Sequence, residues 1–519
     1  MDVTNLATRA WRNLTARKER SPCFALAVTG LFCVALVLVH VNHELWRDEI
    51  HCWSVGRNAD GLWDLLTGNR RYDGHPFLWY YLLYLVSRWS RSEVYLHAVT
   101  VVLATWSAYL WLRHANLPRI LRLMLVGTYC FFFEYSVISR SYTLGVFLAF
   151  LFCRLYDRQE LRFFRLFVVL VLLSFTSIYG SIMAAALGAF LFWQTLAKLR
   201  SGLLAHRHRR TLYRQWLFGM ALVGFAFYVH WKTSLPPADA FYSTSSAKHP
   251  ALFSSAGFGK QFWSALFPWN RRNDGTWIVS GFFGERDGWF KDRLLIFSGV
   301  LLTLWLVALR KVPAAAFGLL VGVTAMALFQ AHQYTGYLRH WGHFFLLLTL
   351  TTWLHAKHDR RRPALLYLLA GLTMSLQLVT NLRAVESEIA EPFSGAKEAA
   401  EYLRAQHLDQ EPILATYDHA TSAIAGYLDR KFLWAETGTE SQTVVFHNRR
   451  YDFPAEHDIL VWAHKTIEEE GRWVLLILNF DLRETLPTLK IDQLFSTKSA
   501  LRADETFLVY RLSLQTIAP

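Results

Sequence analysis

Cysteine is scarce in this sequence, and its placement excludes a fold held by cysteine chemistry. Only five of the 519 residues are cysteine. Cys23, Cys33, Cys130 and Cys153 lie in apolar runs, and Cys52 has no obvious partner. Neither a disulfide framework nor a zinc site is therefore indicated.

The motifs of several soluble enzyme classes are also absent. The sequence contains no G-x-x-x-x-G-K-[ST], G-x-G-x-x-G, H-E-x-x-H or C-x-x-C motif. Nucleotide hydrolysis, dinucleotide chemistry and zinc proteolysis consequently lack support. An Asp-x-Asp motif, which an Mg²⁺-dependent nucleotide-sugar enzyme can show, is missing near the first long loop, and no internal repeat is found.

Long uncharged hydrophobic runs are what the sequence has in abundance. Hydrophobic residues make up 53% of the chain and aromatic residues 16%, which is typical of an integral membrane protein. The first run, "PCFALAVTGLFCVALVLVHV", is too long for a signal-peptide core and has no small-residue cleavage site after it, so we expect a retained helix. The runs predict eleven spanning helices at about 22–41, 94–112, 119–137, 141–156, 163–178, 180–196, 215–231, 294–310, 312–330, 341–356 and 363–380.

Charge decides whether the short run "PFLWYYLLYLV" (76–86) also spans. If it does not, the Lys- and Arg-rich segments all fall on one side, which the positive-inside rule assigns to the cytoplasm. These segments are the N-terminal arm (Arg9, Arg12, Arg17, Lys18, Arg20), 113–122, 154–165, 198–214, Arg310-Lys311 and 357–362. We therefore expect residues 76–86 to lie along the outer membrane surface, within one outer loop of residues 42–93. The net charge of +14 is then a topology signal, and no nucleic-acid partner is expected.

The remaining sequence predicts a second outer loop and a soluble tail. Residues 232–292, rich in Gly, Ser, Pro and Trp, indicate a partly ordered segment at headgroup depth. Residues 381–519 predict an α/β domain, with helices at "SGAKEAAEYLRAQ" and "TSAIAGYL" and strands at "PILATY" and "WVLLILNF". The expected fold is a multi-pass α-helical membrane module, residues 1–380, with interfacial helices in its first outer loop and a C-terminal soluble α/β domain outside the membrane.

Several polar residues fall on outward-facing ends of the predicted spans. Asp48 and Glu49 follow the first span, and each further residue, taken singly, has an ordinary explanation as a snorkelling or headgroup contact. Together they place an acid, two arginines and several imidazoles in one layer, which suits a reaction that expels a phosphate. The further candidates are His75, Glu134, Arg140, Tyr142, Arg339, His340 and His343.

Three stretches resemble a known family. "WRDE" (46–49), "YDGHPFLWYYLL" (72–83) and "EYSVISRSYTLG" (134–145) are similar, in order and in side of the membrane, to the GT-C class of integral-membrane glycosyltransferases. The resemblance is closest to the bacterial branch of protein O-mannosyltransferases and lipid A aminoarabinose transferases. It covers residues 20–200 and weakens through residue 380. Relatives often carry a second proline after His-Pro, where this sequence has Phe77.

The resemblance implies an activity and a place in the cell. The donor would be a sugar on a polyprenyl phosphate, and transfer would occur with inversion on the outer face of the bacterial inner membrane. The N-terminus would be cytoplasmic and the C-terminal domain extracytoplasmic. The acceptor would be an envelope glycan, lipid or protein.

The resemblance also suggests roles for individual residues. Asp48 would be the general base, while Glu49 and His75 would shape the site or, with Asp48, bind a divalent metal, a requirement that varies among relatives. Arg140 and Arg339 would hold the leaving phosphate, Arg339 on position alone. Glu134, Tyr142 and His340 are expected to contribute to substrate binding.

Two other functions stay open from the residues alone. A transporter or flippase of a lipid-linked saccharide would use the same outer cluster without chemistry, although the sequence shows neither the paired repeats nor the broken mid-membrane helices of that class. A non-catalytic envelope protein would bind a polysaccharide or a partner through residues 381–519. The sequence does not name the sugar, the acceptor or the oligomeric state, and leaves acceptor docking and a stabilising cap as equal roles for the tail.

Overall fold

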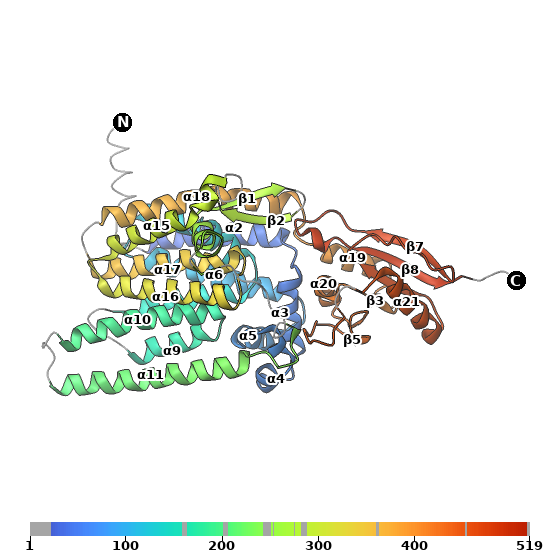
Figure 1. Ribbon diagram of the computed structural model, residues 1–519, viewed down its shortest axis with the longest axis horizontal. Helices are drawn as coiled ribbons and strands as arrows, with labels where there is room; N and C mark the ends of the chain where they lie inside the picture. Colours follow the sequence, from blue (N-terminus) through green and yellow to red (C-terminus); the bar gives the residue numbers. More distant parts are fainter. Residues whose placement is uncertain are drawn as a thin grey trace, which may run out of the picture.

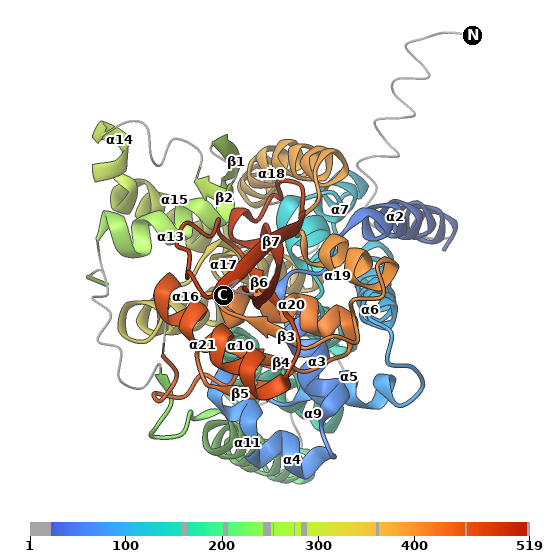
Figure 2. The same cartoon turned by 90° about the vertical axis from the view of Figure 1, so that its right-hand side faces the viewer.

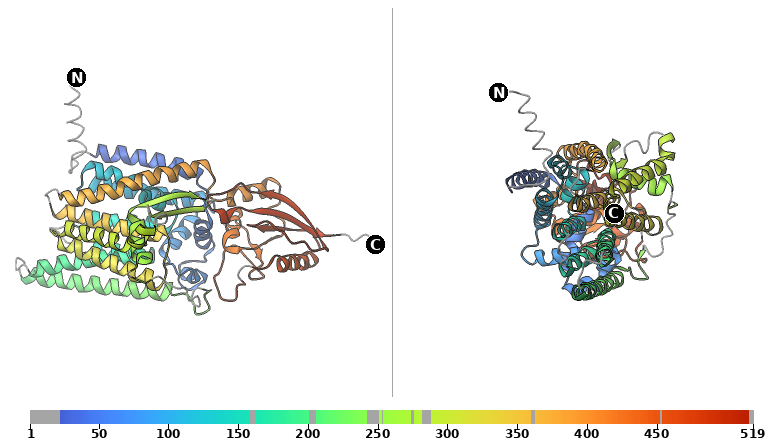
Figure 3. Two further views of the ribbon diagram at one scale, coloured as in Figure 1. Left: turned by 45° about the horizontal axis from the view of Figure 1, so that its top comes forward. Right: turned by 90° about the vertical axis from the view of Figure 1, so that its left-hand side faces the viewer.

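The computed structural model describes residues 22–157, 163–200, 206–241, 251–252, 254–273, 276–281, 288–359, 363–451 and 454–515. Within them the chain is mostly helical and ends in a mixed β-sheet. Long helices run side by side, and the C-terminal domain lies at one end of them (Figure 1). From the opposite end most of the long helices are seen nearly end-on (Figure 3). The basic N-terminal arm lies outside the described residues.

Five helices are long and apolar enough to cross a membrane. They are α2 (Cys23–Asn42), α6 (Val94–His114), α10 (Ile178–Arg200), α16 (Pro313–His332) and α18 (Ala364–Ala390). A helix of about 20 residues rises about 30 Å, which matches the hydrocarbon thickness of a bilayer. A sixth crossing is formed if α7 (Arg119–Val126) and the π-helical η2 (Tyr129–Val137), bent by 41° at their junction, act as one span.

Helices also occupy the other five predicted spans. Three are short apolar helices, α8 (Ser141–Leu155), α9 (Phe163–Ser174) and α15 (Leu294–Leu309). The other two are α11 (His206–Ser234) and α17 (Leu338–His358). Within the described residues, neither is among the helices that are long and apolar enough to cross a membrane. Five or six candidate spans among the described residues are consistent with a membrane protein, and the number eleven stays a prediction.

Short helices fill the predicted first outer loop. They are α3 (Arg47–Asn58), α4 (Leu62–Thr67), η1 (Asn69–Asp73) and α5 (Leu78–Ser87), and they lie between the long helices and the C-terminal domain (Figure 1). With ten residues, α5 rises only about 15 Å, half the thickness of the hydrocarbon core. The length of α5 agrees with a helix that does not span.

The second predicted outer loop contains several short elements. They are η3 (Ser255–Gly259), α13 (Lys260–Leu266), the hairpin of β1 (Pro268–Asn273) and β2 (Thr276–Gly281), and α14 (Gly288–Asp292). Burial of aromatic rings anchors α13 on α17, where Phe262 and Phe344 have centroids 5.3 Å apart. The loop is thereby tied to the membrane helices.

The C-terminal domain is an α/β unit built on six strands in the order β5-β4-β3-β6-β8-β7. β4, β3 and β6 are parallel, and the remaining pairs are antiparallel. The predicted helices and strands are present as α19 (Ala396–Ala405), α20 (Asp418–Leu428), β3 (Ile413–Ala415) and β6 (Val474–Leu478). The further elements are β4 (Phe432–Trp434), β5 (Thr439–Ser441), α21 (Glu456–Glu470), β7 (Leu489–Ser496), η4 (Ala503–Glu505) and β8 (Leu508–Leu514).

The predicted boundary at residues 380/381 falls inside a continuous helix. The apolar run ends near residue 380, but α18 continues to Ala390. Polar residues extend this helix because its inner side stays buried, with Ala384 and Glu388 at 0% and 2% exposure. The linker into the α/β domain therefore begins at Glu391.

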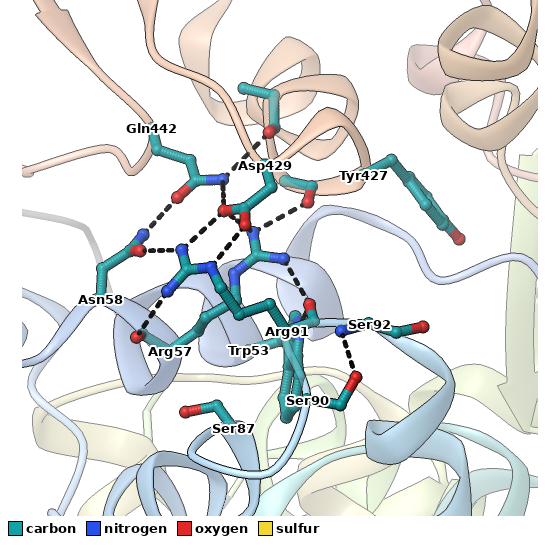
Figure 4. Close-up of polar contacts among 12 residues, drawn as sticks. Trp53, Arg57, Asn58, Ser87, Ser90, Arg91, Ser92, Tyr427, Asp429 and Gln442 are labelled. Atoms are coloured by element: carbon teal, nitrogen blue, oxygen red, sulfur yellow. Dashed lines mark hydrogen bonds and ion pairs between the residues drawn. The ribbon is translucent and has the colours of Figure 1, made fainter. Parts of the chain in front are cut away.

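Polar contacts clamp the C-terminal end of α3 to the C-terminal domain (Figure 4). Arg57 contacts Asp429 at 3.1 Å and donates to the backbone oxygen of Gly426 at 2.9 Å, while Asn58 donates to Gln442. Arg91, just before α6, pairs with the same Asp429 at 2.6 Å. Figure 2 looks onto this domain and shows it lying across the ends of the long helices.

Candidate active site

Asp48 lies in the first turn of α3 and is shared between two arginines from distant parts of the chain. Its Oδ2 lies 2.9 Å from Nη1 of Arg140 and 3.1 Å from Nη2 of Arg339. Arg140 immediately precedes α8, and Arg339 is in the first turn of α17. The side chain of Asp48 keeps 26% of its surface exposed, so the carboxylate is gripped but accessible.

The surrounding charges determine the protonation state of Asp48. Burial alone would raise its pKa, but Arg140, Arg339, Arg47 and Arg502 outweigh burial and hold the pKa well below its ordinary value. Asp48 is therefore ionised at neutral pH. While both arginines are bound to it, the carboxylate is a weak base.

The arginines around Asp48 retain hydrogen-bonding capacity. Nε of Arg140, of Arg339 and of Arg502 is buried, and none of the three has a hydrogen-bond acceptor among the described residues. Buried polar groups are normally satisfied, and guanidinium groups bind phosphate oxygens in a forked geometry. The described residues therefore leave part of the donor capacity of these three arginines unused.

An indole ring fixes two of these guanidinium groups. The ring of Trp46, which is 4% exposed, has Arg339 5.2 Å and Arg502 4.4 Å from its centroid. Such cation–π contacts orient a cation without neutralising it. Trp46 thus keeps positive charge beside Asp48.

The C-terminal domain contributes directly to this site. Arg502 lies just before η4. Two acidic residues of η4 hold the start of α3. Asp504 pairs with the Arg47 side chain, and Glu505 accepts a hydrogen bond of 3.3 Å from the Arg47 backbone N–H. Burial raises the pKa of Glu505 to about 7, although Arg47 opposes this rise. The site is therefore assembled from both parts of the chain.

Glu49, predicted beside Asp48, has a different environment. Its side chain is fully buried. One oxygen accepts from the Ser139 backbone N–H, and the other contacts His43 Nε2 at 3.0 Å and the Trp46 N–H at 3.3 Å. His43 also contacts Glu388 of α18 at 2.8 Å. Both oxygens of Glu49 are thus engaged by groups that position α3, and its role in the site stays a prediction.

His75 lies near the cluster but is not a cation at neutral pH. Burial, with Arg140 nearby, lowers the pKa of His75 to about 4. Asp73, two residues before His75, forms a second acid–imidazole pair with His51, whose Nε2 lies 3.0 Å away. Asp73 also accepts a hydrogen bond of 3.1 Å from the Tyr80 hydroxyl. A neutral His75 can donate or accept a hydrogen bond but cannot neutralise a phosphate.

Three more of the predicted residues, Tyr142, His340 and His343, form a layer of packed rings. Tyr142 lies with its ring centroid 6.0 Å from that of His340 and 5.2 Å from that of His343. Tyr179 stacks on both imidazoles, at 5.2 and 4.7 Å. His340 accepts from the Tyr337 backbone N–H at 2.9 Å, so it has a structural task at the start of α17.

Glu134 lies in η2, and its carboxylate accepts a hydrogen bond of 2.6 Å from the Tyr129 hydroxyl. Only 7% of Glu134 is exposed. The structure therefore places this residue in the packed wall of the site, where Tyr129 holds its carboxylate.

The residues suggested for a divalent metal do not fit one. No group of three or more His, Cys, Asp or Glu side chains within the described residues is arranged to hold a metal ion. Asp48 faces arginines, and Glu49 is occupied by His43 and backbone N–H groups. Positive side chains thus take the place that a cation would have beside Asp48.

The predicted list of site residues did not include Trp46, Arg47, Asp73 or Arg502. The first three stand inside or next to the motifs "WRDE" and "YDGHP", so a signal for them existed. Arg502 had none, because it is more than 450 residues from Asp48 in the chain and only folding brings it near.

Neither the protein-family models nor the curated proteins compared with this chain match it. The function is therefore inferred from the chemistry of the site and from the resemblance of its short motifs.

Proposed function

We propose that this protein is an integral-membrane glycosyltransferase that transfers a sugar from a polyprenyl-phosphate donor to an acceptor hydroxyl. The observation that carries the proposal is the Asp48 carboxylate held between Arg140 and Arg339 beside the ends of apolar helices. A polyprenyl chain needs the bilayer, whereas its phosphate and sugar need a polar site at headgroup depth. This cluster offers both an anion-binding group and a proton acceptor there.

The reaction is a single displacement. The acceptor oxygen attacks the anomeric carbon, and its proton passes to Asp48. The bond between the anomeric carbon and the phosphate oxygen breaks, and its electron pair leaves with the polyprenyl phosphate. One-step displacement inverts the anomeric centre.

Arg140 and Arg339 stabilise the leaving group in this scheme. The donor phosphodiester carries one negative charge, and the departing phosphomonoester gains a second as the bond breaks. Guanidinium groups therefore bind the transition state more strongly than the ground state, which is the condition for lowering the barrier.

Donor binding would also activate Asp48. In the free protein, the arginines hold the Asp48 pKa well below its ordinary value. A phosphate that competes for the same guanidinium groups weakens those ion pairs, so the pKa of Asp48 rises toward its ordinary value. The base becomes effective only when the donor is in place.

We propose that the site faces the outside of a bacterial plasma membrane and that the eleven helical segments cross it. Support comes from the distribution of basic residues. Arg119 and Arg122 lie over the ring of Phe24, at the start of α2, at 4.8 and 5.3 Å, whereas Asp48 follows the other end of α2. The positive-inside rule assigns the basic end to the cytoplasm.

The decisive experiment is replacement of Asp48 by Asn. Transfer of labelled sugar from polyprenyl phosphate should fall by about 10²–10⁴-fold, the usual contribution of a general base, while insertion into the membrane is unchanged. Asp60→Asn, which alters an exposed carboxylate in the same loop, should keep wild-type turnover.

Transfer at the wild-type rate by Asp48→Asn would remove Asp48 as the base. If wild-type membranes moved the labelled lipid-linked saccharide across the bilayer and transferred no sugar, the flippase would replace the glycosyltransferase as the function.

A further inference from the structure

A second polar site lies where the first outer loop meets the C-terminal domain. A cavity of about 320 Å³ is bounded by Asn69 and Tyr72 on one side and by residues 434–447 with Asp418 on the other. Its volume falls within the range of about 300–1,000 Å³ found for small-molecule sites. The Asp48 cluster does not contribute to its lining.

The cavity lies at the β4–β5 edge of the sheet. Trp434 is the last residue of β4, and Asp418 begins α20 with two residues between it and the end of β3, so both lie at the carboxyl ends of parallel strands. The lining continues along β5, which pairs antiparallel with β4.

The lining chemistry indicates the kind of ligand. Hydroxyl groups come from Tyr72 and from the Thr and Ser residues of 437–443, and an amide comes from Asn69. The Asp418 carboxylate in the wall is buried and bound on both oxygens by Arg450, so no ligand contact is assigned to it. Among the described residues that line the cavity, none is lysine or arginine. Hydroxyls and an amide match the alternating donors and acceptors of a sugar, whereas a phosphate would call for cations.

Contacts between distant segments hold the cavity walls in place. The Tyr72 hydroxyl donates to Asp239 at 3.0 Å, and the Asp239 backbone oxygen accepts from the Asn448 N–H at 2.7 Å. Ala240 forms an isolated antiparallel bridge with His447. A ligand in this cavity would therefore contact the membrane module and the C-terminal domain together.

We propose that this cavity binds a neutral saccharide and, resting on the proposed glycosyltransferase function, that this saccharide is part of the acceptor. Donor and acceptor then have separate sites of different chemistry. The arginine cluster binds the phosphate of the donor, and the hydroxyl-rich cavity, which lacks cations among its described lining residues, binds the glycan that receives the sugar.

The test compares two substitutions on one strand of the full chain in nanodiscs. Thr439 lines the cavity, whereas the neighbouring Glu440 does not, because successive side chains of a strand point to opposite faces. The probe is an array of neutral hexose and N-acetylhexosamine oligosaccharides, with sulfated oligosaccharides as an anionic comparison. Wild type and Glu440→Trp should retain the same neutral glycans. Thr439→Trp should bind these glycans at least tenfold less, while its thermal midpoint stays equal to that of wild type.

Equal binding by Thr439→Trp and Glu440→Trp, retention of no neutral glycan by wild type, or preference for the sulfated oligosaccharides would overturn the cavity proposal. Asp48→Asn separates this result from the proposed reaction, because it should keep wild-type glycan binding. Glycan binding without sugar transfer would support the cavity proposal and contradict the proposed glycosyltransferase function. Sugar transfer that does not depend on Thr439 would support the glycosyltransferase function and contradict the cavity proposal.

Discussion

Asp48 forms ion pairs with Arg140 at 2.9 Å and with Arg339 at 3.1 Å, and each of these arginines also has a buried Nε–H with no acceptor among the described residues. One carboxylate therefore satisfies only part of the hydrogen-bonding capacity of the pair. Under the proposed function, a donor phosphate competes with Asp48 for the guanidinium groups and so releases Asp48 to accept a proton. The low pKa of Asp48 is a consequence of the arginines beside it.

Replacement of Arg140 by Ala tests this coupling at the residue scale. Loss of one guanidinium should lower kcat for sugar transfer by about 10²–10³-fold, as for other donors aimed at developing negative charge. The pKa of Asp48 should also rise, since the first of its stabilising cations is removed. The acidic limb of the profile of kcat/KM against pH should therefore move to higher pH.

Arg472→Ala is the control, because Arg472 is half-exposed on the C-terminal domain and should leave rate and profile unchanged. A wild-type kcat and an unmoved acidic limb in Arg140→Ala would exclude the phosphate-binding role of Arg140.

At the scale of elements, α3 positions the site because it is held at both ends. Its N-terminal turn contacts η4 through Arg47, and its last residues contact Asp429 and Gln442 (Figure 4). Between these ends α20 packs on α3 so closely that a Cβ on Gly426 would lie 2.5 Å from Cγ1 of Ile50. A change in this packing should reach Asp48, which lies on the same helix.

Gly426→Ala should therefore destabilise the protein by about 1–3 kcal/mol, as expected for overpacking, and should lower transfer activity. The measurement is the thermal midpoint in nanodiscs together with turnover. Gly299→Ala is the matched control, since a Cβ there meets no atom within 4 Å. A midpoint for Gly426→Ala equal to that of the control would show that α20 and α3 can separate without cost.

At the scale of the whole molecule, the C-terminal domain is a wall of the site and not only an appendage. Arg502 stacks on Trp46, and the Arg502 and Leu501 backbone N–H groups donate to Phe393 and Pro392 of the linker. Deletion of residues 381–519 would consequently remove a cation from the Asp48 cluster. Truncation would alter both proposed sites at once, whereas each point substitution alters one of them.

The junction between the two parts should respond to pH through Glu505. Its folded pKa of about 7 exceeds the ordinary carboxyl value of about 4.3, so the folded protein keeps a proton that the unfolded chain releases. Stability contributed by Glu505 is present below about pH 4 and is lost as pH rises to about 7. Glu505→Gln should therefore gain stability relative to wild type across this window, by on the order of 3 kcal/mol at its upper end.

Thermal midpoints of both proteins between about pH 5 and 8 measure this difference. Glu470→Gln, which changes a half-exposed carboxylate, should follow the wild-type curve throughout. A constant difference between Glu505→Gln and wild type at all pH values would show that Glu505 does not titrate in this range.

Much of the fold was predictable because bilayer thickness and backbone satisfaction leave few solutions for long apolar runs. The helices α19 and α20 and the strands β3 and β6 followed from local hydrophobic periodicity. The sequence also named Asp48, Arg140 and Arg339 as candidates, because the distribution of charge predicts all three on one side of the membrane. Their roles in catalysis stay predictions.

Tertiary structure alone decided how these residues share their charges. Nothing local distinguishes Asp48, which faces arginines, from Glu49, which faces His43 and backbone N–H groups, because adjacent positions on a helix point about 100° apart and meet different neighbours. Likewise, nothing local places Arg502 over Trp46. By itself the sequence determined which segments can enter a membrane and which polar groups gather at their ends, since hydropathy and charge act locally. Which carboxylate is available for chemistry depends on long-range contacts, and only the folded chain makes those.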